Sequence, residues 1–210
     1  NANSKLLLNS ITVDSVSTTI DNSLGVDVDN DSTITSLSVA NITPVSIASG
    51  KTLSGAITVT AGSINLDETG TLASTVEMSG GVLDADKSLT ISGALTQSGD
   101  TTIDVLDNKT LTYSGAPLSL WANTLTLTGG GTLVSGGLDL NNADSKLLLN
   151  SITVDSVSTT VDNSLGVDVD NDSTITSFSV ANITPVSIAN TKTLSGAITV
   201  TAGSINLDET

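Results

Sequence analysis

A long internal repeat constrains this chain more than any other feature of its sequence. Residues 1–69 recur as 142–210, and 64 of these 69 positions are identical. The chain therefore holds one complete unit, 1–141, followed by the first half of a near-identical unit, 142–210. A long tandem repeat indicates an architecture in which each unit packs against the next. We expect a continuous stack with no linker between the two units.

Within the unit the local pattern is that of successive β-strands. Apolar residues alternate with Ser and Thr in segments such as 53–60, 124–128 and 153–157. Alternation with a period of two, rich in Val, Ile and Thr, is typical of strands that bury one face. No stripe of helix-forming residues with a 3.6-residue period is sustained. The sequence therefore predicts an all-β chain with essentially no helix.

The connections between these strands favour a solenoid over hairpins. The dipeptides Asn-Gly and Asp-Gly, which mark two-residue hairpin turns, do not occur. Instead, apolar residues at the starts of strands recur in steps of about 17 to 22 residues. These positions are Ile34, Leu53, Leu72, Leu89, Leu111 and Leu133. Such steps predict a single-stranded parallel β-helix (a β-solenoid) with coils of about 17–22 residues and about seven coils per unit.

Two details of this fold prediction can be checked against a structure. The step from Leu7 to Ile34 is longer than any of the others, so we expect the first coil to carry a longer loop. At a strand spacing of about 4.8 Å, one unit of a solenoid would advance by roughly 34 Å. The alternative fold is a series of tandem β-sandwich domains of the Ig-like adhesin type, which would need the hairpin turns that this sequence lacks.

The composition excludes most catalytic chemistry. The chain has no His, no Cys and no Arg, and only three aromatic residues, whereas Ser, Thr and Asn account for 81 of 210 residues. His/Cys metal sites, disulfides and Ser–His–Asp or Cys–His catalysis are therefore excluded. We expect a protein that is not an enzyme. Val, Ile and Leu supply more than a quarter of the chain, which is enough to build a core.

The charge narrows the choice of partners. Six Lys stand against 22 Asp and Glu, for a formal net charge of −16. Nucleic-acid phosphates and anionic membrane surfaces would be repelled, so we expect no nucleic-acid partner. No apolar run reaches the roughly 18 residues of a transmembrane helix, so we expect no membrane insertion. Because the chain has neither an initiator Met nor a signal peptide, we expect it to be a piece of a longer protein.

Two Asp-rich segments are the candidate metal sites. Their members are Asp27, Asp29 and Asp31 and, in the second unit, Asp168, Asp170 and Asp172. Carboxylates at i, i+2 and i+4 would suit a hard cation such as Ca²⁺, which takes six to eight oxygen ligands. An EF-hand loop would need Gly and Glu where Ser32 and Ser38 stand. The alternative is that the intervening Val residues point inward, the Asp side chains are solvated, and no cofactor is bound.

Two further patterns bear on ligands. Asp84 and Asp86 have the spacing of a carboxylate pair for glycoside hydrolysis, but the aromatic walls and Arg of a sugar site are missing. Thr-x-Thr pairs, as at 33–35 and 58–60, resemble the arrays of ice-binding β-solenoids but start at irregular intervals. A β-solenoid module that binds calcium, ice or a glycan is therefore the alternative function.

The Ser/Thr/Gly-rich strands, the coils of about 20 residues and the near-identical long repeats resemble the shafts of large bacterial surface adhesins of the filamentous-haemagglutinin-like and autotransporter types. Those shafts are right-handed parallel β-helices, so the resemblance implies a right-handed solenoid here. The resemblance covers the whole chain and rests on composition and pattern. It implies a stalk or spacer of a very long secreted adhesin or filament, located outside the cell on the bacterial surface.

The partners implied are neighbouring repeats of the same chain and the surface of a host or partner cell. Uncapped solenoid ends expose unpaired strand edges, and the sequence shows no amphipathic capping helix. We therefore also expect end-to-end self-association.

Overall fold

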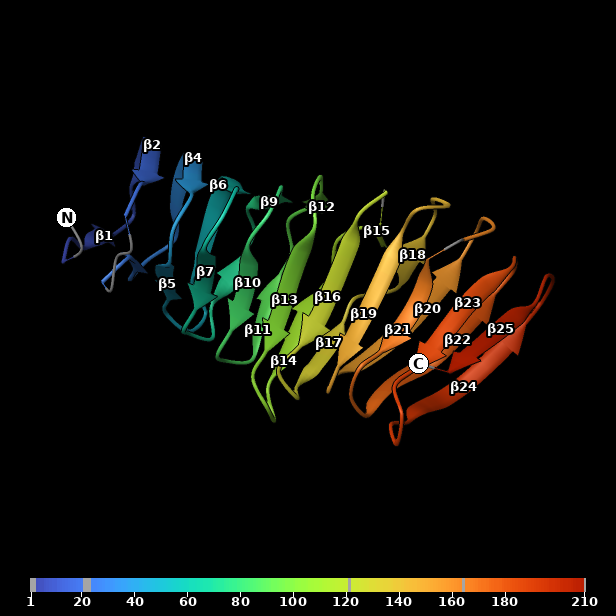
Figure 1. The fold of residues 1–210 in the computed structure, drawn as a ribbon. Coiled ribbons are helices and arrows are strands. Elements are labelled where there is room, and N and C mark those ends of the chain that lie inside the picture. The colour runs from blue at the N-terminus through green and yellow to red at the C-terminus, as the bar shows by residue number, and fades with distance from the viewer. Residues whose placement is uncertain (1–2, 21–23, 121, 164, 210) are drawn as a thin grey trace.

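The computed structural model describes residues 3–20, 24–120, 122–163 and 165–209; Trp121 is outside the described residues. These residues form 25 strands and no helix. The strands wind into a parallel β-solenoid of about ten turns, an elongated body with the two chain ends at opposite ends (Figure 1). The predicted all-β class and parallel solenoid are confirmed.

One side of the solenoid is a sheet of eleven strands, in which neighbouring strands are one turn apart. Its members, in order along the rod, are β1 (Leu6–Leu8), β3 (Val26–Val28), β5 (Thr43–Ile47), β7 (Ser63–Leu66), β10 (Val82–Ala85), β13 (Thr101–Val105), β16 (Thr124–Thr128), β19 (Lys146–Asn150), β21 (Gly166–Val169), β23 (Thr184–Ile188) and β25 (Ile205–Glu209). Seven steps separate β1 from its repeat equivalent β19, which agrees with the seven coils expected per unit.

The remainder of each turn belongs to a second sheet of fourteen strands. Long single strands occur in the repeated segments: β2 (Thr12–Thr18), β4 (Ser32–Val39), β6 (Thr52–Val59), β20 (Thr153–Thr159), β22 (Ser173–Val180) and β24 (Leu194–Val200). In the turns between them the strand is split in two by a bend: β8 (Thr71–Leu72) and β9 (Thr75–Met78), β11 (Leu89–Ile91) and β12 (Leu95–Gln97), β14 (Thr110–Tyr113) and β15 (Leu118–Ser119), β17 (Thr132–Val134) and β18 (Leu138–Leu140).

The pairing between adjacent turns gives the length of each coil. The length of a coil is the number of residues between two positions that pair in adjacent turns. In the eleven-stranded sheet the coils are shortest at steps such as the one where Ile64 pairs with Leu83, and the longest coil is the one where Ile103 pairs with Leu127. The longest coil exceeds the upper limit of the predicted range by two residues. From β13 to β16 each of the three connections has four residues, whereas those from β10 to β13 have three. The extra length is therefore spread over the corners of that turn.

The expected longer loop in the first coil is wrong. Leu7 pairs with Asp27 in the eleven-stranded sheet, whereas Ile34 pairs with Val13 in the other sheet, and each pairing spans one ordinary turn. The long step from Leu7 to Ile34 therefore joins positions on two different faces. The β-sandwich alternative is wrong as well, since the sheets are parallel and stack as a solenoid.

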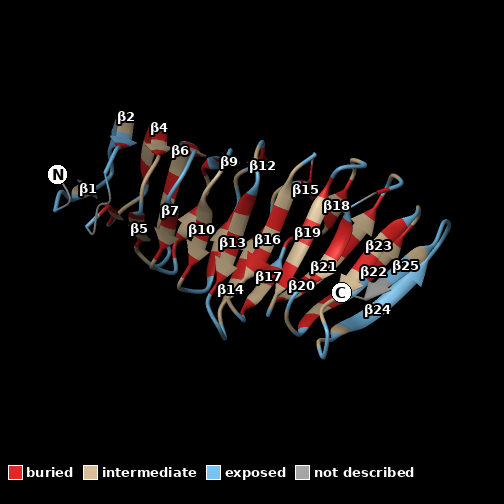
Figure 2. Cartoon of the chain, in the orientation of Figure 1, coloured by how far each residue is buried: buried red, intermediate tan, exposed pale blue. Residues whose placement is uncertain are grey.

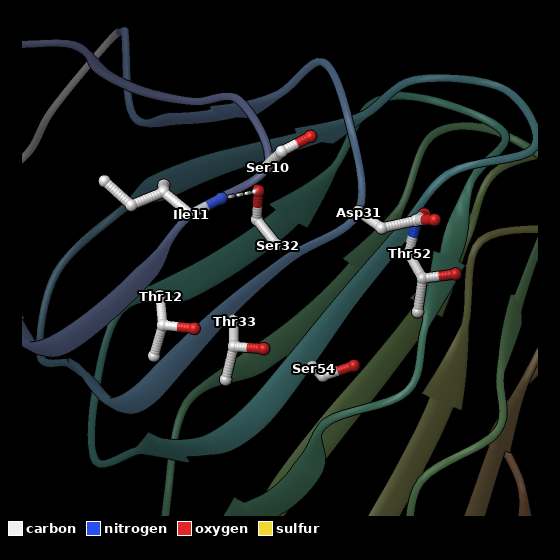
Figure 3. A pocket seen from close by; sticks show the side chains of 8 residues that line it. All are labelled: Ser10, Ile11, Thr12, Asp31, Ser32, Thr33, Thr52 and Ser54. Atoms are coloured by element: carbon white, nitrogen blue, oxygen red, sulfur yellow. Dashed lines mark hydrogen bonds between the residues drawn. The ribbon is translucent and has the colours of Figure 1, made fainter.

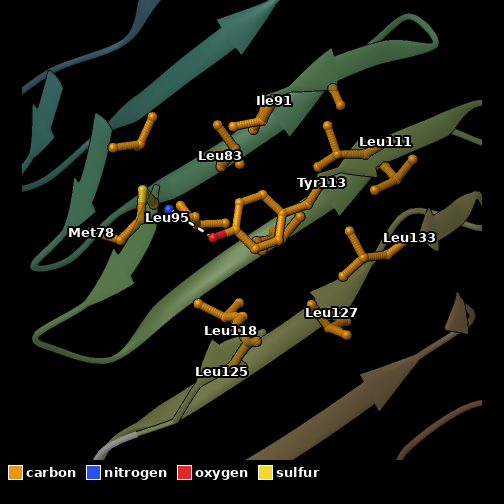
Figure 4. Close-up of a cluster of buried hydrophobic side chains, with 14 of the residues drawn as sticks. Met78, Leu83, Ile91, Leu95, Leu111, Tyr113, Leu118, Leu125, Leu127 and Leu133 are labelled. Atoms are coloured by element: carbon orange, nitrogen blue, oxygen red, sulfur yellow. Dashed lines mark hydrogen bonds between the residues drawn. The ribbon is translucent and has the colours of Figure 1, made fainter. Parts of the chain in front are cut away.

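The interior is one continuous apolar core, built mainly from Val, Ile and Leu side chains that come from alternate positions of most strands (Figure 2). Tyr113 is buried in this core. The Tyr113 hydroxyl accepts a hydrogen bond from the backbone N–H of Leu95 at 3.1 Å (Figure 4). A Cβ at Gly115 would lie 2.4 Å from that hydroxyl, so only glycine fits beside the ring. Small aliphatic residues thus fill a narrow interior that has room for few rings.

Candidate functional site

The long strands of the second sheet place hydroxyl groups on the outer surface of the rod. Because side chains alternate along a strand, Thr12, Thr33 and Ser54 face outward, and they lie in register on successive turns. Together with residues of the preceding corners, they line an open groove of about 280 Å³ (Figure 3). The lining residues are Ser10, Ile11, Thr12, Asp31, Ser32, Thr33, Thr52 and Ser54.

Two of the lining residues hold the corners of the turns together. The Asp31 carboxylate accepts a hydrogen bond from the backbone N–H of Thr52 at 2.8 Å. The Ser32 hydroxyl donates to the carbonyl of Asn30 at 2.8 Å and accepts from the N–H of Ile11 at 3.4 Å. The wall of the groove is therefore built mainly from short polar side chains, with no aromatic surface against which a sugar ring would stack.

The same groove recurs at the equivalent positions of the second unit, with a volume of about 260 Å³. Asp172 accepts from the N–H of Thr193 at 2.8 Å, and the Ser173 hydroxyl donates to the carbonyl of Asn171 at 2.8 Å. The outward Thr153, Thr174 and Ser195 repeat the row of the first copy. Both copies of the repeated segment thus present the same polar groups on the surface of the rod.

Threonine residues also form two longer rows in register across successive turns. The first row is Thr52, Thr71, Thr90 and Thr112, and the second is Thr110, Thr132, Thr153 and Thr174. All of them are half-buried. The irregular sequence intervals concealed these rows because coils of unequal length still bring equivalent positions into register.

The predicted calcium ligands have other partners in this structure. Asp27 forms an ion pair with Lys5, and Asp168 forms one with Lys146 at 2.5 Å. The third Asp of each segment, Asp31 or Asp172, accepts the corner hydrogen bond described above.

The middle residues, Asp29 and Asp170, follow β3 and β21, where their backbone N–H groups donate to carbonyls of the preceding turn. Among the residues that the structure describes, no group of three or more Asp, Glu, His or Cys side chains is placed to hold a metal ion. Calcium binding stays a prediction, and unfolding temperatures measured with Ca²⁺ and with a chelator would test it: equal values would contradict it.

A second acidic group lies on the outer face of the eleven-stranded sheet, across three turns. Asp84 stands directly opposite Asp104 in the pairing of β10 with β13, and Asp86 is among the groups that raise the pKa of Asp67. Burial raises the pKa of Asp84 to about 6, with further contributions from Asp86, Asp104 and Asp67. Burial also raises the pKa of Asp104 and of Asp67. The pair Asp84 and Asp86 thus belongs to a row of mutually repelling carboxylates.

Asp155 links the two units, and no pattern in the sequence indicates this role. Its carboxylate accepts hydrogen bonds from the Ser135 N–H at 3.0 Å, the Ser135 hydroxyl at 2.9 Å and the Gly136 N–H at 3.0 Å. Partial burial acts to raise the pKa of Asp155, but the hydrogen bonds from Ser135, Ser156 and Gly136 outweigh it and hold that pKa below its ordinary value. Asp155 therefore fixes the bend between β17 and β18, one turn before it.

Comparisons with protein-family models, with curated proteins and with solved structures each return no match for this chain. Within the described residues, no helix has the length and apolar character needed to cross a membrane. The candidate sites are therefore interpreted from their own geometry.

Proposed function

We propose that this chain is a stalk or spacer segment of a very long, secreted bacterial surface adhesin or filament, located outside the cell and without catalytic activity. The observation that carries the proposal is the continuity of the stack across the unit boundary. There β16 of the first unit pairs with β19 of the second, so the coils resume without interruption. The pairing of β20 with β22 then repeats that of β2 with β4.

The mechanism of such a segment is mechanical. Each turn contacts only its neighbours, so the stability of the rod grows with the number of turns, and its length grows with the number of units. Backbone pairing on two sheets and one continuous apolar core support a stiff rod. The acidic surface favours solubility and keeps parallel rods apart.

Small-angle scattering on chains of one, two and three complete units tests this proposal. We expect the maximum dimension to rise by roughly 34 Å with each added unit at constant cross-section. Growth of the cross-section, or flexible beads on a string, would contradict a spacer. Antibody labelling of intact cells that produce the full protein tests the surface location, and signal only after lysis would contradict it.

The in-register threonine rows favour a second candidate function, the binding of ice or of a glycan at a cell surface. Outward hydroxyl groups repeat at the strand spacing of about 4.8 Å along each row, an interval at which a periodic ligand could be matched. An ice-shaping assay and a glycan array test this candidate. Round, unfaceted crystals together with an empty array would exclude it and leave the spacer function alone.

A further inference from the structure

Two adjacent turns in the middle of the rod lack one of the strand ladders that would join them. One turn consists of β10, β11 and β12, and the next consists of β13, β14 and β15. β10 pairs with β13 and β11 pairs with β14, but β12 and β15 are in contact without pairing and form the two open ends of the fourteen-stranded sheet. At the other junctions between described turns, each strand pairs with the next turn. We call the contact between these two turns the central junction.

A side chain takes the place of part of the missing ladder. The carbonyl of Ala94 accepts a hydrogen bond from Val76 of the preceding turn, so the next N–H along the chain, that of Leu95, is directed to the following turn. There it donates to the hydroxyl of Tyr113, which belongs to β14 (Figure 4). The Tyr113 side chain thus serves as a clasp between the two turns where β15 supplies no backbone acceptor.

The end of β12 also holds a buried polar atom that has no partner. Gln97 is 5% exposed, and its Nε2 donates to the carbonyl of Thr124 at 2.8 Å. Within the described part of the chain, the buried Oε1 of Gln97 has no hydrogen-bond partner. A buried acceptor without a donor costs free energy in the closed structure. This cost disappears when the two turns separate and water reaches the amide.

The eleven-stranded sheet adds a repulsion across the same junction. Asp84 of β10 and Asp104 of β13 occupy directly opposed positions, and like charges opposed on neighbouring strands destabilise a sheet. On its other side Asp84 faces the uncharged Asn65 of β7, so this repulsion belongs to the central junction and not to the preceding one. The missing ladder, the unpartnered amide oxygen and the opposed carboxylates therefore weaken one and the same contact.

We propose that the central junction is a joint of the rod, which opens reversibly while the turns on either side of it stay folded. The connection between β12 and β13 keeps the two parts linked when the joint is open. In a tandem array the joint recurs once per unit, so a load along the rod separates turns at the joints before other turns unfold. The spacer role requires only length, and the joint is a property beyond it.

Amide hydrogen exchange of the whole chain, followed by nuclear magnetic resonance, tests the proposal on matched amides. Thr102 and Ser114 donate backbone hydrogen bonds across the central junction, at 3.1 and 3.0 Å. Val82 and Ser92 donate across the preceding junction, each at 2.9 Å, and they match Thr102 and Ser114 in exposure. After correction for intrinsic rates, we expect Thr102 and Ser114 to exchange on the order of tenfold faster. Equal protection at the two junctions would overturn the proposal.

Two variants shift the opening of the joint in opposite directions. Tyr113→Phe keeps the ring but removes the acceptor for Leu95, so we expect exchange at Thr102 and Ser114 to become about fivefold faster, with the preceding junction unchanged. Asp104→Asn removes one of the opposed charges, and we expect exchange at the same two amides to become about twofold to fivefold slower.

Asp144→Asn is the matched control, because it removes the same charge from an exposed position away from the central junction. We expect it to leave the exchange of Thr102 and Ser114 unchanged. Equal effects of Asp104→Asn and Asp144→Asn, or faster exchange along the whole rod in Tyr113→Phe, would overturn the proposal. Rods that lengthen with each unit but show equal protection at both junctions would reject the joint and retain the spacer.

Discussion

The two copies of the repeated segment, 1–69 and 142–210, differ in burial although their sequences are nearly the same. The first copy has turns after it, and the second has turns before it. Ile57 and Val59 are fully buried in the first copy, whereas Ile198 and Val200 at the same positions are half exposed. The neighbouring turn alone makes this difference. A core residue of a solenoid is therefore buried jointly by its own turn and the next one.

The contrast is strongest in the outermost turn. Phe178 and Val180, one turn before the last, are 1% and 0% exposed, like Leu37 and Val39 in the first copy. One covering turn is thus sufficient to close the core. The exchange of Leu37 for Phe178 also shows that a position inside the core accepts a larger side chain where the adjacent turn leaves room. Contacts that reach only the nearest turn make stability a sum of local terms.

The largest difference in stability between the two copies is expected when equivalent isoleucines are truncated in each. Ile57→Ala leaves a cavity between β6 and β9, and we expect it to lower the free energy of unfolding by about 2–5 kcal/mol. Ile198→Ala removes a side chain that is already half exposed, so we expect a loss below about 1 kcal/mol. Urea unfolding followed by far-ultraviolet circular dichroism measures both values. Equal losses would contradict the idea that the next turn buries Ile57.

The equivalent aspartates Asp155 and Asp14 give the second contrast. Asp155→Ala leaves the Ser135 and Gly136 donors without their acceptor, and we expect a loss of about 1–3 kcal/mol. Asp14→Ala removes an exposed side chain and should leave the stability of the monomer unchanged. Urea midpoints of the two variants check this difference.

The pH dependence follows from the lowered pKa of Asp155. A carboxylate with a lowered pKa stabilises the fold above its ordinary value of about 3.9, and this contribution is lost as the pH falls through the folded pKa. The difference between Asp155→Ala and the unchanged chain should therefore shrink below about pH 4 in urea titrations. A gap that stays constant between pH 3 and pH 7 would contradict the charged hydrogen bonds.

The turns that follow the first copy contain a row of carboxylates whose mutual repulsion lowers the stability of the fold. The pKa of Asp84 is raised to about 6, so the folded chain binds this proton more tightly than the unfolded chain does. Between about pH 4 and 6 the contribution of Asp84 to stability therefore falls as the pH rises. We expect Asp84→Asn to raise stability at pH 7 by on the order of 1 kcal/mol, after allowance for solvent screening, and to flatten this slope.

Asp144→Asn is the matched control, since it removes the same charge from an exposed position. Urea midpoints at pH 4, 5, 6 and 7 for the two variants and the unchanged chain give the measurement. If Asp144→Asn raised stability as much as Asp84→Asn, the effect would come from net charge and not from the row of opposed carboxylates.

These cases show what the sequence can and cannot predict here. The period-two pattern and the regular steps between strand starts predict strands and parallel coils, because inward Leu and Ile recur once per turn. They do not identify the face, so Leu7 and Ile34 resemble successive positions of one coil although they lie in different sheets. The Asp155 contact depends on the register between turns of unequal length. No local motif contains that register, and the same holds for the threonine rows.

The smallest expected effect comes from a turn in which the two copies differ in sequence. Gly50 has φ +72°, and its equivalent Thr191 has φ 66°, a left-handed conformation that costs a β-branched residue more than glycine. The backbone hydrogen bond that closes the turn is the same in both copies. The backbone N–H groups of Lys51 and Lys192 each donate to an Ala carbonyl at 2.9 Å. Nothing lies within 4 Å of a Cβ built on Gly50, so the strain is confined to the backbone.

We therefore expect Thr191→Gly to raise the free energy of unfolding and Gly50→Thr to lower it, each by about 0.5–1 kcal/mol, because the entropy of glycine in the unfolded chain offsets part of the strain. The change in unfolding free energy should be larger for Gly50→Thr, because the turn at residue 50 has a covering turn on each side. The turn at residue 191 precedes the uncovered last turn and opens more readily. Urea midpoints of the two single variants and of the double variant test this order. A lower midpoint for Thr191→Gly would show that the Thr191 side chain contributes contacts that compensate for its backbone conformation.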